Sequence, residues 1–453
     1  MSEIGQIRRA ATDGAAIPGE RQISSRPVPA ARLWPQLAPA LLRRSFALGD
    51  RIAERYGPSP RPLTAEALID RAQRQTRLDD FGEFPFARPL EILLESLDRE
   101  AALSLFGRLA LRWDCLRFLT NLLQLREAEK RERSILRETI SQPIFIAGLP
   151  RSGTTFLHRL FAQDPGNRIV RCCETIYPDA ARGDAAADIV RRRKVDRQLS
   201  LFAALAPGFS ELHPIDADAP QECTEITAHL FTSLRFDTTH HVPSYRAWLD
   251  RTDATPAYRF HRRFLQHLQW QKGRGQWVLK CPDHVFTLGA IKQVYPDARF
   301  VFVHRDPLSV LASVAKLTEL LRAPFTRKLD RHQIGQQVSE RWVEGAGLIV
   351  SDAETRDYIH HVHYRSLIAD PLSTVSALYA HFGLPFTAKA RSLIEEFIRD
   401  TPRGGYGVNR YDFGESGLDA VALQEQFRPY MTAFGIESEW KARADNPRAL
   451  TPA

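Results

Sequence analysis

The spacing of hydrophobic residues changes near Pro143. Between about residues 41 and 137, apolar residues recur at helical spacing, as at Leu90, Leu93 and Leu97, and proline-containing joints separate the segments. From Pro143 onward, short continuous apolar runs replace this period, and such runs are typical of buried strands. The pattern therefore predicts a helical N-terminal region that precedes a region of mixed strands and helices.

Four apolar runs after Pro143 are candidate strands, and a helix-like segment follows each one. They are residues 144–147, 277–280, 300–303 and 359–363. Short buried strands that alternate with helices are typical of a parallel sheet covered on both faces. We therefore expect an α/β fold, with a P-loop-like parallel sheet flanked by helices and a helical N-terminal region.

The chain divides into four parts by the same criteria. Residues 1–30 mix Ala, Gly, Pro, Arg and Ser without periodicity, which indicates a disordered arm. Residues 31–140 form the helical N-terminal region, 141–400 the α/β domain, and 401–453 a C-terminal tail expected on or near the functional site. Within the α/β domain, about 165–260 is the least regular stretch and is long enough to carry substrate-binding insertions.

Composition narrows the class of protein only a little. The 453 residues include 62 Lys and Arg against 54 Asp and Glu, a formal charge of +8 that favours anionic ligands of any kind. No basic run with interleaved aromatic residues is present, so nucleic acid is not an expected partner. The five cysteines lack metal-site spacing, and no stretch resembles a signal peptide or membrane span. We expect a cytoplasmic enzyme without a transmembrane segment; its oligomeric state is open.

The first candidate strand runs into a glycine-rich loop, Gly148-x-x-x-x-Gly153-Thr154-Thr155. This spacing matches a P-loop, in which backbone N–H groups and a helix N-terminus surround a phosphate. Thr154 replaces the usual lysine, and an ordinary ATPase or GTPase is therefore disfavoured. The residues expected to contact the anion are Arg151, Ser152, Gly153, Thr154 and Thr155. The alternative is a plain Gly/Pro turn capped by Ser152 or Thr154.

A second phosphate site is expected after the third strand. Arg305 follows residues 300–303, at the carboxyl end of a strand, where open α/β sheets bind ligands. A guanidinium there can hold a phosphate through two parallel hydrogen bonds. Ser313 lies eight residues later on the next helix. The alternative is a turn in which Arg305 pairs with Asp306 and Ser313 has no ligand.

These two segments are similar to those of sulfotransferases that use 3′-phosphoadenosine 5′-phosphosulfate (PAPS). Residues 151–155 resemble the family's phosphosulfate loop, and Arg305 with Ser313 resembles its 3′-phosphate pair. The resemblance runs from about residue 143 to 384 and looks closest to a bacterial branch with the motif W-V-L-K-x-P-x-H, here residues 277–284. It implies sulfuryl transfer from PAPS, without a metal, to a hydroxyl or amine of a small-molecule, glycan or lipid acceptor.

The resemblance also implies contacts to the adenine. Tyr364 is similar to a family tyrosine whose ring lies near the base. Phe156 stands where many members carry a stacking tryptophan; it keeps the aromatic face and lacks the indole N–H. Residues 403–405, Arg-Gly-Gly, match the family's Arg-Lys-Gly sequence only in part.

Sulfuryl transfer needs an in-line acceptor oxygen, a base for its proton, and cations near the leaving phosphate. Lys280 matches the family's lysine and is expected to donate to the bridging oxygen; the alternative is an exposed strand-end lysine. His284 is the preferred base, because a neutral imidazole accepts a proton near pH 7, and its alternative is a structural hydrogen bond. Glu222 is the second candidate base, and His213 the third.

Other histidines suggest binding roles less directly. His360, His361 and His363 lie along one candidate strand, but only two of them share a face and no carboxylate partner is evident, so we predict no metal site. His240 and His241 lie among aromatic residues and are candidates for lining an acceptor pocket.

Two other classes of function compete with sulfuryl transfer. The first is a P-loop kinase, which would need Mg²⁺ and ATP and which the missing loop lysine disfavours. The second is a noncatalytic nucleotide-binding scaffold, in which loss of Lys280 or His284 would leave function intact.

Overall fold

The computed structural model describes residues 44–46, 48–51, 62–179, 183–206, 215–351, 358–401 and 414–439. All of these belong to one compact unit, residues 39–453. The arm expected at 1–30, His213 and the Arg-Gly-Gly sequence at 403–405 lie outside the described residues. The division of the chain into four parts stays a prediction.

The described N-terminal region contains α2 (Ala65–Thr76), α3 (Ala87–Glu100) and α4 (Leu105–Arg131), followed by the short η1 (Arg133–Arg137). Residues 44–46 and 48–51 are also helical. Thr64 and Ser104 cap α2 and α4, since their side-chain oxygens accept from backbone N–H groups three residues on. Leu90, Leu93 and Leu97 are buried, as their spacing predicts. These helices form their own apolar cluster with α10 (Arg235–Thr239) and α11 (Pro243–Leu249).

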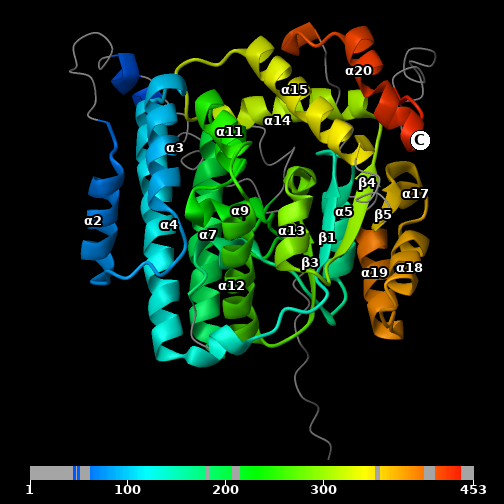
Figure 1. Cartoon of the computed structure of the whole chain (residues 1–453), viewed down its shortest axis with the longest axis horizontal. Helices are drawn as coiled ribbons and strands as arrows, with labels where there is room; N and C mark the ends of the chain where they lie inside the picture. The colour runs from blue at the N-terminus through cyan, green and yellow to red at the C-terminus, as the bar shows by residue number, and fades with distance from the viewer. Residues whose placement is uncertain are drawn as a thin grey trace, which may run out of the picture. The chain divides into compact units, whose positions relative to one another are not determined.

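A five-stranded parallel sheet lies at the centre of the α/β region (Figure 1). Its strands are β1 (Ile144–Gly148), β2 (Asn167–Arg168), β3 (Gln276–Lys280), β4 (Arg299–His304) and β5 (Ile359–His363), in the order β2-β3-β1-β4-β5. The four predicted strands and the α/β fold are confirmed. The edge strand β2 was not predicted, because two polar residues carry no hydrophobic period.

Helices cover both faces of the sheet because side chains of each strand alternate between the faces. Phe145 and Ala147 belong to the apolar cluster of one face, and Ile144 and Ile146 to that of the other. The first cluster includes residues of α12 (Thr255–Lys272), α13 (Leu288–Val294), α14 (Pro307–Arg322), α15 (Arg331–Ser351) and α20 (Ala420–Ala433). The second includes residues of α5 (Thr154–Ala162), α17 (Tyr364–Ala369), α18 (Pro371–His381) and α19 (Ala388–Asp400).

The stretch between β2 and β3 is more helical than the sequence pattern indicates. Besides α10, α11 and α12 it contains α6 (Cys172–Ile176), α7 (Ala185–Leu205), α9 (Thr224–Thr227) and η2 (Ala228–Leu230). The 21-residue helix α7 buries only Arg191, Val195 and Leu205. With so few buried apolar positions it shows no amphipathic period, and a prediction based on periodicity misses it.

Helix α15 supports the C-terminal part of the chain through a close backbone contact. A Cβ added at Gly335 would lie 2.0 Å from the carbonyl oxygen of Ser416, in η5 (Gly414–Ser416), which precedes α20. A Cβ added at Gly347, on the same helix, would meet nothing within 4 Å. Of these two glycines, Gly335 is therefore the one that packing requires.

We predict that Gly335→Ala lowers the free energy of unfolding by about 1–3 kcal/mol, because η5 must shift. The matched control Gly347→Ala is expected to raise it by about 0.5–1 kcal/mol, since alanine is the better helix former. Urea unfolding followed by circular dichroism measures both. Equal effects of the two substitutions would contradict the packing of η5 on α15.

Candidate active site

The candidate site lies where β1, β3 and β4 end, because parallel strands present their carboxyl ends at one edge of the sheet. The loop after β1 starts at Gly148, where a Cβ would lie 2.6 Å from the carbonyl oxygen of Val303 on β4. The loop ends at Gly153, where a Cβ would lie 2.8 Å from the Tyr364 ring, at a φ of +95°. Both glycines are therefore needed for the close approach of their neighbours.

The end of this loop has the features of an anion site. Helix α5 begins at Thr154, and no side chain of the described residues caps its first turn. Its N-terminal N–H groups can therefore bind an anion. The Ser152 hydroxyl is fully buried, and no hydrogen-bond partner occurs for it in the described part of the chain. A buried hydroxyl without a partner is what a loop that awaits a phosphate oxygen would contain.

Arg305 lies directly after β4 and contacts the loop after β1. Its Nη1 donates to the backbone oxygen of Arg151 at 2.9 Å, and its guanidinium carbon lies 4.0 Å from the centre of the Tyr364 ring. Its Nε and Nη2 donate to the two carboxylate oxygens of Glu439 at 3.2 and 3.1 Å. Arg305 therefore pairs with Glu439 rather than with Asp306.

Asp306 and Ser313 anchor the same corner of the site. The Asp306 carboxylate caps α14 by accepting from the backbone N–H of Leu308 at 3.0 Å. Ser313, on α14, accepts a hydrogen bond from Nε of Arg151 at 3.1 Å. The structure thus brings the predicted residues Arg151, Arg305 and Ser313 into one network.

The two expected aromatic residues differ in position. Tyr364, the first residue of α17, lies against both Gly153 and Arg305 at the site. Phe156 is 4% exposed and packs against Phe397 of α19, with ring centres 6.4 Å apart. The ring of Phe156 is therefore part of the apolar core in this structure, and its stacking on adenine stays a prediction.

Lys280 and Glu222 form an ion pair at the end of β3, although 58 residues separate them in the chain. The Lys280 side chain is only 2% exposed, and that of Glu222 is 29% exposed. The backbone N–H of Cys223 donates to the Lys280 carbonyl at 3.2 Å and holds the two segments together. Lys280 is therefore not an exposed strand-end lysine, and its ammonium group points at a carboxylate that solvent reaches.

His284 lies in the η3 turn (Pro282–Phe286) and is 1% exposed. Its Nδ1 is 2.9 Å from the Tyr258 hydroxyl, and its ring packs edge-on against Phe145. Burial, with the nearby charges of His261 and Lys280, holds the pKa of His284 well below its usual value. Such an imidazole is neutral and closed off from solvent, whereas the Glu222 side chain is 29% exposed, so solvent access favours Glu222 over His284 as the candidate base.

His158 belongs to this site but was not singled out from the sequence. It lies on α5, one helical turn after Thr154, and its Nε2 donates to the Val278 carbonyl at 3.0 Å. Burial first, and then the charge of Lys280, lowers the pKa of His158 to about 3. The four-residue spacing from Thr154 was a usable signal, because it places both side chains on one face of the helix.

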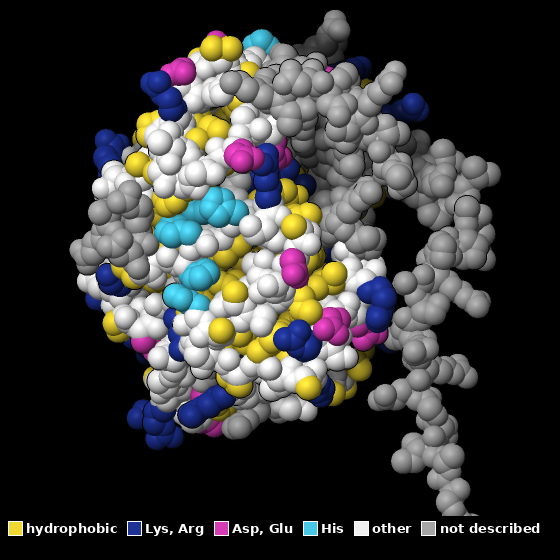
Figure 2. All heavy atoms as spheres, turned by 90° about the vertical axis from the view of Figure 1, so that its right-hand side faces the viewer, with side chains coloured by type: hydrophobic (Ala, Val, Ile, Leu, Met, Phe, Trp, Pro, Cys, Tyr) yellow, Lys and Arg dark blue, Asp and Glu magenta, His cyan; other side chains and the backbone are white. Residues whose placement is uncertain are grey.

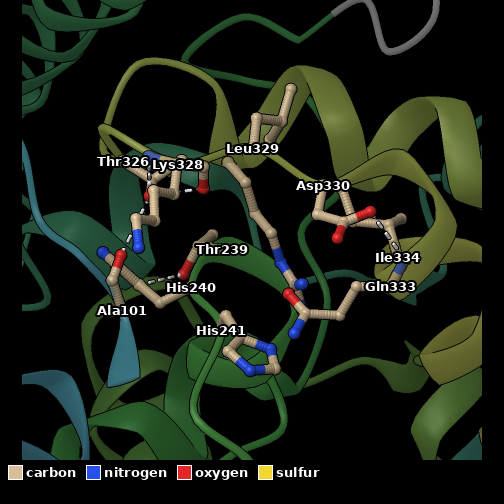
Figure 3. Close-up of a pocket in the computed structure, with 11 residues that line it drawn as sticks. Ala101, Thr239, His240, His241, Thr326, Lys328, Leu329, Asp330, Gln333 and Ile334 are labelled. Atoms are coloured by element: carbon tan, nitrogen blue, oxygen red, sulfur yellow. Dashed lines mark hydrogen bonds between the residues drawn. The ribbon is translucent and has the colours of Figure 1, made fainter. Parts of the chain in front are cut away.

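A small pocket lies between the end of α10 and the connection from α14 to α15 (Figure 3). His240 and His241 line it, as do Arg322 and Gln333. The Arg322 guanidinium donates to the backbone carbonyl of Asp237. Neither Lys280 nor Glu222 is among the residues that line this pocket, and a role of His240 and His241 in an acceptor pocket stays a prediction.

Histidine side chains gather on the face that carries α17, α18 and α19 (Figure 2). The rings of His360 and His381 lie 4.3 Å apart, and His304 contacts His361 at 2.8 Å. Within the described ranges, no group of three or more His, Cys, Asp or Glu is arranged to hold a metal ion. Among the helices that the structure describes, none is long and apolar enough to cross a membrane.

Comparison with known proteins agrees with this geometry. A model of the sulfotransferase family matches residues 143–388, more than half of the chain. Omega-hydroxy-beta-dihydromenaquinone-9 sulfotransferase Stf3 from Mycobacterium bovis is 28% identical over 282 residues, which cover 59% of this chain and 69% of that protein.

Two solved structures are similar over most of the chain. Sulfotransferase STF1 from Mycobacterium tuberculosis H37Rv is 31% identical, with a TM-score of 0.71, and the match covers 81% of this chain and 98% of that one. Sulfotransferase STF9 from Mycobacterium avium, 24% identical with a TM-score of 0.71 over 83% of this chain and 98% of that one, shares the fold. The protein therefore belongs to the sulfotransferase family and is an enzyme that transfers a sulfuryl group.

Proposed function

We propose that the sulfuryl donor is PAPS and that the corner formed by the loop after β1 and by Arg305 binds it. The observation that carries this proposal is the contact of the Arg305 guanidinium with both the Arg151 carbonyl and the Tyr364 ring. It puts a cation for a 3′-phosphate and an aromatic ring for a purine beside the N-terminus of α5. A nucleotide with phosphates on both sides of its ribose fits such a corner.

The P-loop-like segment would hold the 5′-phosphosulfate. The residues assigned to it are Arg151, Ser152, Gly153, Thr154 and Thr155. The N–H groups at the start of α5 stabilise negative charge, and the unpartnered Ser152 hydroxyl supplies a further donor. Arg305 and Ser313 would bind the 3′-phosphate, and no metal ion is needed for either contact.

In the transfer step, the acceptor hydroxyl attacks the sulfur in line with the bond to the 5′-phosphate. The new S–O bond forms as the bridging S–O bond breaks, and adenosine 3′,5′-bisphosphate leaves. Lys280 donates to the bridging oxygen and stabilises its growing charge. Glu222, which is exposed enough to meet the acceptor, takes the proton. His284 remains the second candidate base.

The acceptor is proposed to be a hydroxyl-bearing small molecule, glycan or lipid, or an amine of the same classes. The name of the Stf3 relative describes sulfation of a hydroxylated menaquinone, which makes a lipid alcohol the first acceptor to test.

Adenosine 3′,5′-bisphosphate is expected to bind in the presence of EDTA, and Arg305→Ala should weaken it about 10- to 100-fold by removing charge-assisted hydrogen bonds. Arg299→Ala is the matched control, because Arg299 is at the opposite end of the same strand. Calorimetric titration measures each affinity. Binding of Mg²⁺-ATP instead of the bisphosphate, or equal losses in both variants, would contradict the proposed donor site.

Glu222→Gln is expected to lower kcat by about 10²- to 10⁴-fold, since the acceptor proton loses its base, while the bisphosphate still binds. Asp218→Asn is the control, because Asp218 lies in the same acidic segment and is 49% exposed. Radiolabelled PAPS and a hydroxylated prenyl quinone serve as substrates, with product counted in the lipid extract. If His284→Gln lowers kcat far more than Glu222→Gln in folded protein, His284 is the base.

A further inference from the structure

The segment that follows α20 brings two carboxylates to the nucleotide corner. Glu439 pairs with Arg305, and Glu437 pairs with Arg365, which directly follows Tyr364 in α17. The two acids are alternate residues in the last described part of the chain. The two acids thus pair with the arginine that lies over the Tyr364 ring and with the arginine next to Tyr364 in the chain.

The pairing of Glu439 with Arg305 has the geometry of an anion bound to a guanidinium. Two parallel N–H···O bonds of 3.2 and 3.1 Å join the groups, and each side chain is 18% exposed. A phosphate uses the same fork of donors as a carboxylate. Nη1 of Arg305 already donates to the Arg151 carbonyl. Glu439 occupies the other edge of the guanidinium, where Nε and Nη2 lie side by side.

Packing of α20 holds the start of the segment, and polar contacts of Glu439 hold its end. On α20, the Tyr430 hydroxyl lies 2.9 Å from Nδ1 of His304, and Phe434 stacks on the same ring at 4.2 Å. Gly435 follows with a φ of +59° and an open surrounding. Beyond it, the backbone N–H of Glu439 donates to the Asp306 carboxylate at 2.7 Å. The backbone N–H of Ile436 donates to the Met431 carbonyl of α20 at 2.8 Å, so the part that can swing away while α20 stays packed is residues 437–439.

We infer that Glu439 is an intramolecular competitor of the nucleotide's 3′-phosphate, and that residues 437–439 form a strap that nucleotide binding displaces. This inference rests on the proposed function, because it takes Arg305 as the 3′-phosphate ligand. In the nucleotide-free protein the strap supplies the counter-charge that Arg305 needs when half-buried. A nucleotide that binds must replace the Glu439 carboxylate on Arg305 with its own 3′-phosphate. The closed strap therefore lowers the apparent affinity for the nucleotide.

The test is the affinity of Glu439→Gln for adenosine 3′,5′-bisphosphate, measured by calorimetry. If the closed strap is about ten times as populated as the open strap in the wild type, the variant binds the bisphosphate about tenfold tighter than the wild type does. Glu437→Gln is the matched control, since it removes the same charge two residues away without releasing Arg305. Adenosine 5′-monophosphate is the ligand control: it has no 3′-phosphate, so Glu439→Gln should leave its affinity unchanged.

A second readout follows the strap itself. Hydrogen exchange at residues 437–439 should speed up when the bisphosphate binds, because the Glu439 amide leaves Asp306. Unchanged or weaker bisphosphate binding in Glu439→Gln, or equal tightening in Glu437→Gln, overturns the inference while the donor site stands. If neither wild type nor Glu439→Gln binds the bisphosphate, the proposed donor itself is wrong, and the two failures are thereby distinguished.

Discussion

The parallel pairing of β1 with β4 is the constraint on which the site depends. The register runs from Ile144 opposite Arg299 to Gly148 opposite Val303, so both strands end at the same level. The loop after β1 and the arginine after β4 must therefore meet. Gly148 makes the meeting close, because any side chain there would collide with the Val303 carbonyl. The strand register and the absence of a Cβ at Gly148 therefore set the relative position of the two segments that are proposed to bind the nucleotide.

Two cations at this edge of the sheet have acidic partners. Lys280 pairs with Glu222 and Arg305 with Glu439, and three of these four side chains are less than a fifth exposed. A half-buried cation without a counter-ion is costly, so these acids stabilise the two cations in the protein without a ligand. In the function proposed above, the same acids gain a second role: Glu222 would accept the proton, and Glu439 would be displaced.

The two candidate bases, His284 and Glu222, differ more in burial than their residue types suggest. His284 has the side chain best suited to proton transfer near pH 7, but the core holds it between Tyr258 and Phe145. Glu222 keeps solvent access and pairs with Lys280, the proposed donor to the leaving group. Burial thus decides which group can meet an acceptor, and residue chemistry alone does not.

The local sequence pattern was sufficient to predict most of the strands and the segments of the candidate site. The apolar runs predicted four of the five strands. The glycine spacing of the first loop and the spacing of Arg305 and Ser313 pointed to two segments that the structure brings into contact. Both signals could be used because period and spacing are local properties of a chain. Tertiary structure alone decided the rest. It supplied the two-residue strand β2, the pairing of Lys280 with a carboxylate 58 residues away, and the placement of Glu439 on Arg305. These contacts depend on how distant elements pack, and no short stretch of sequence records that.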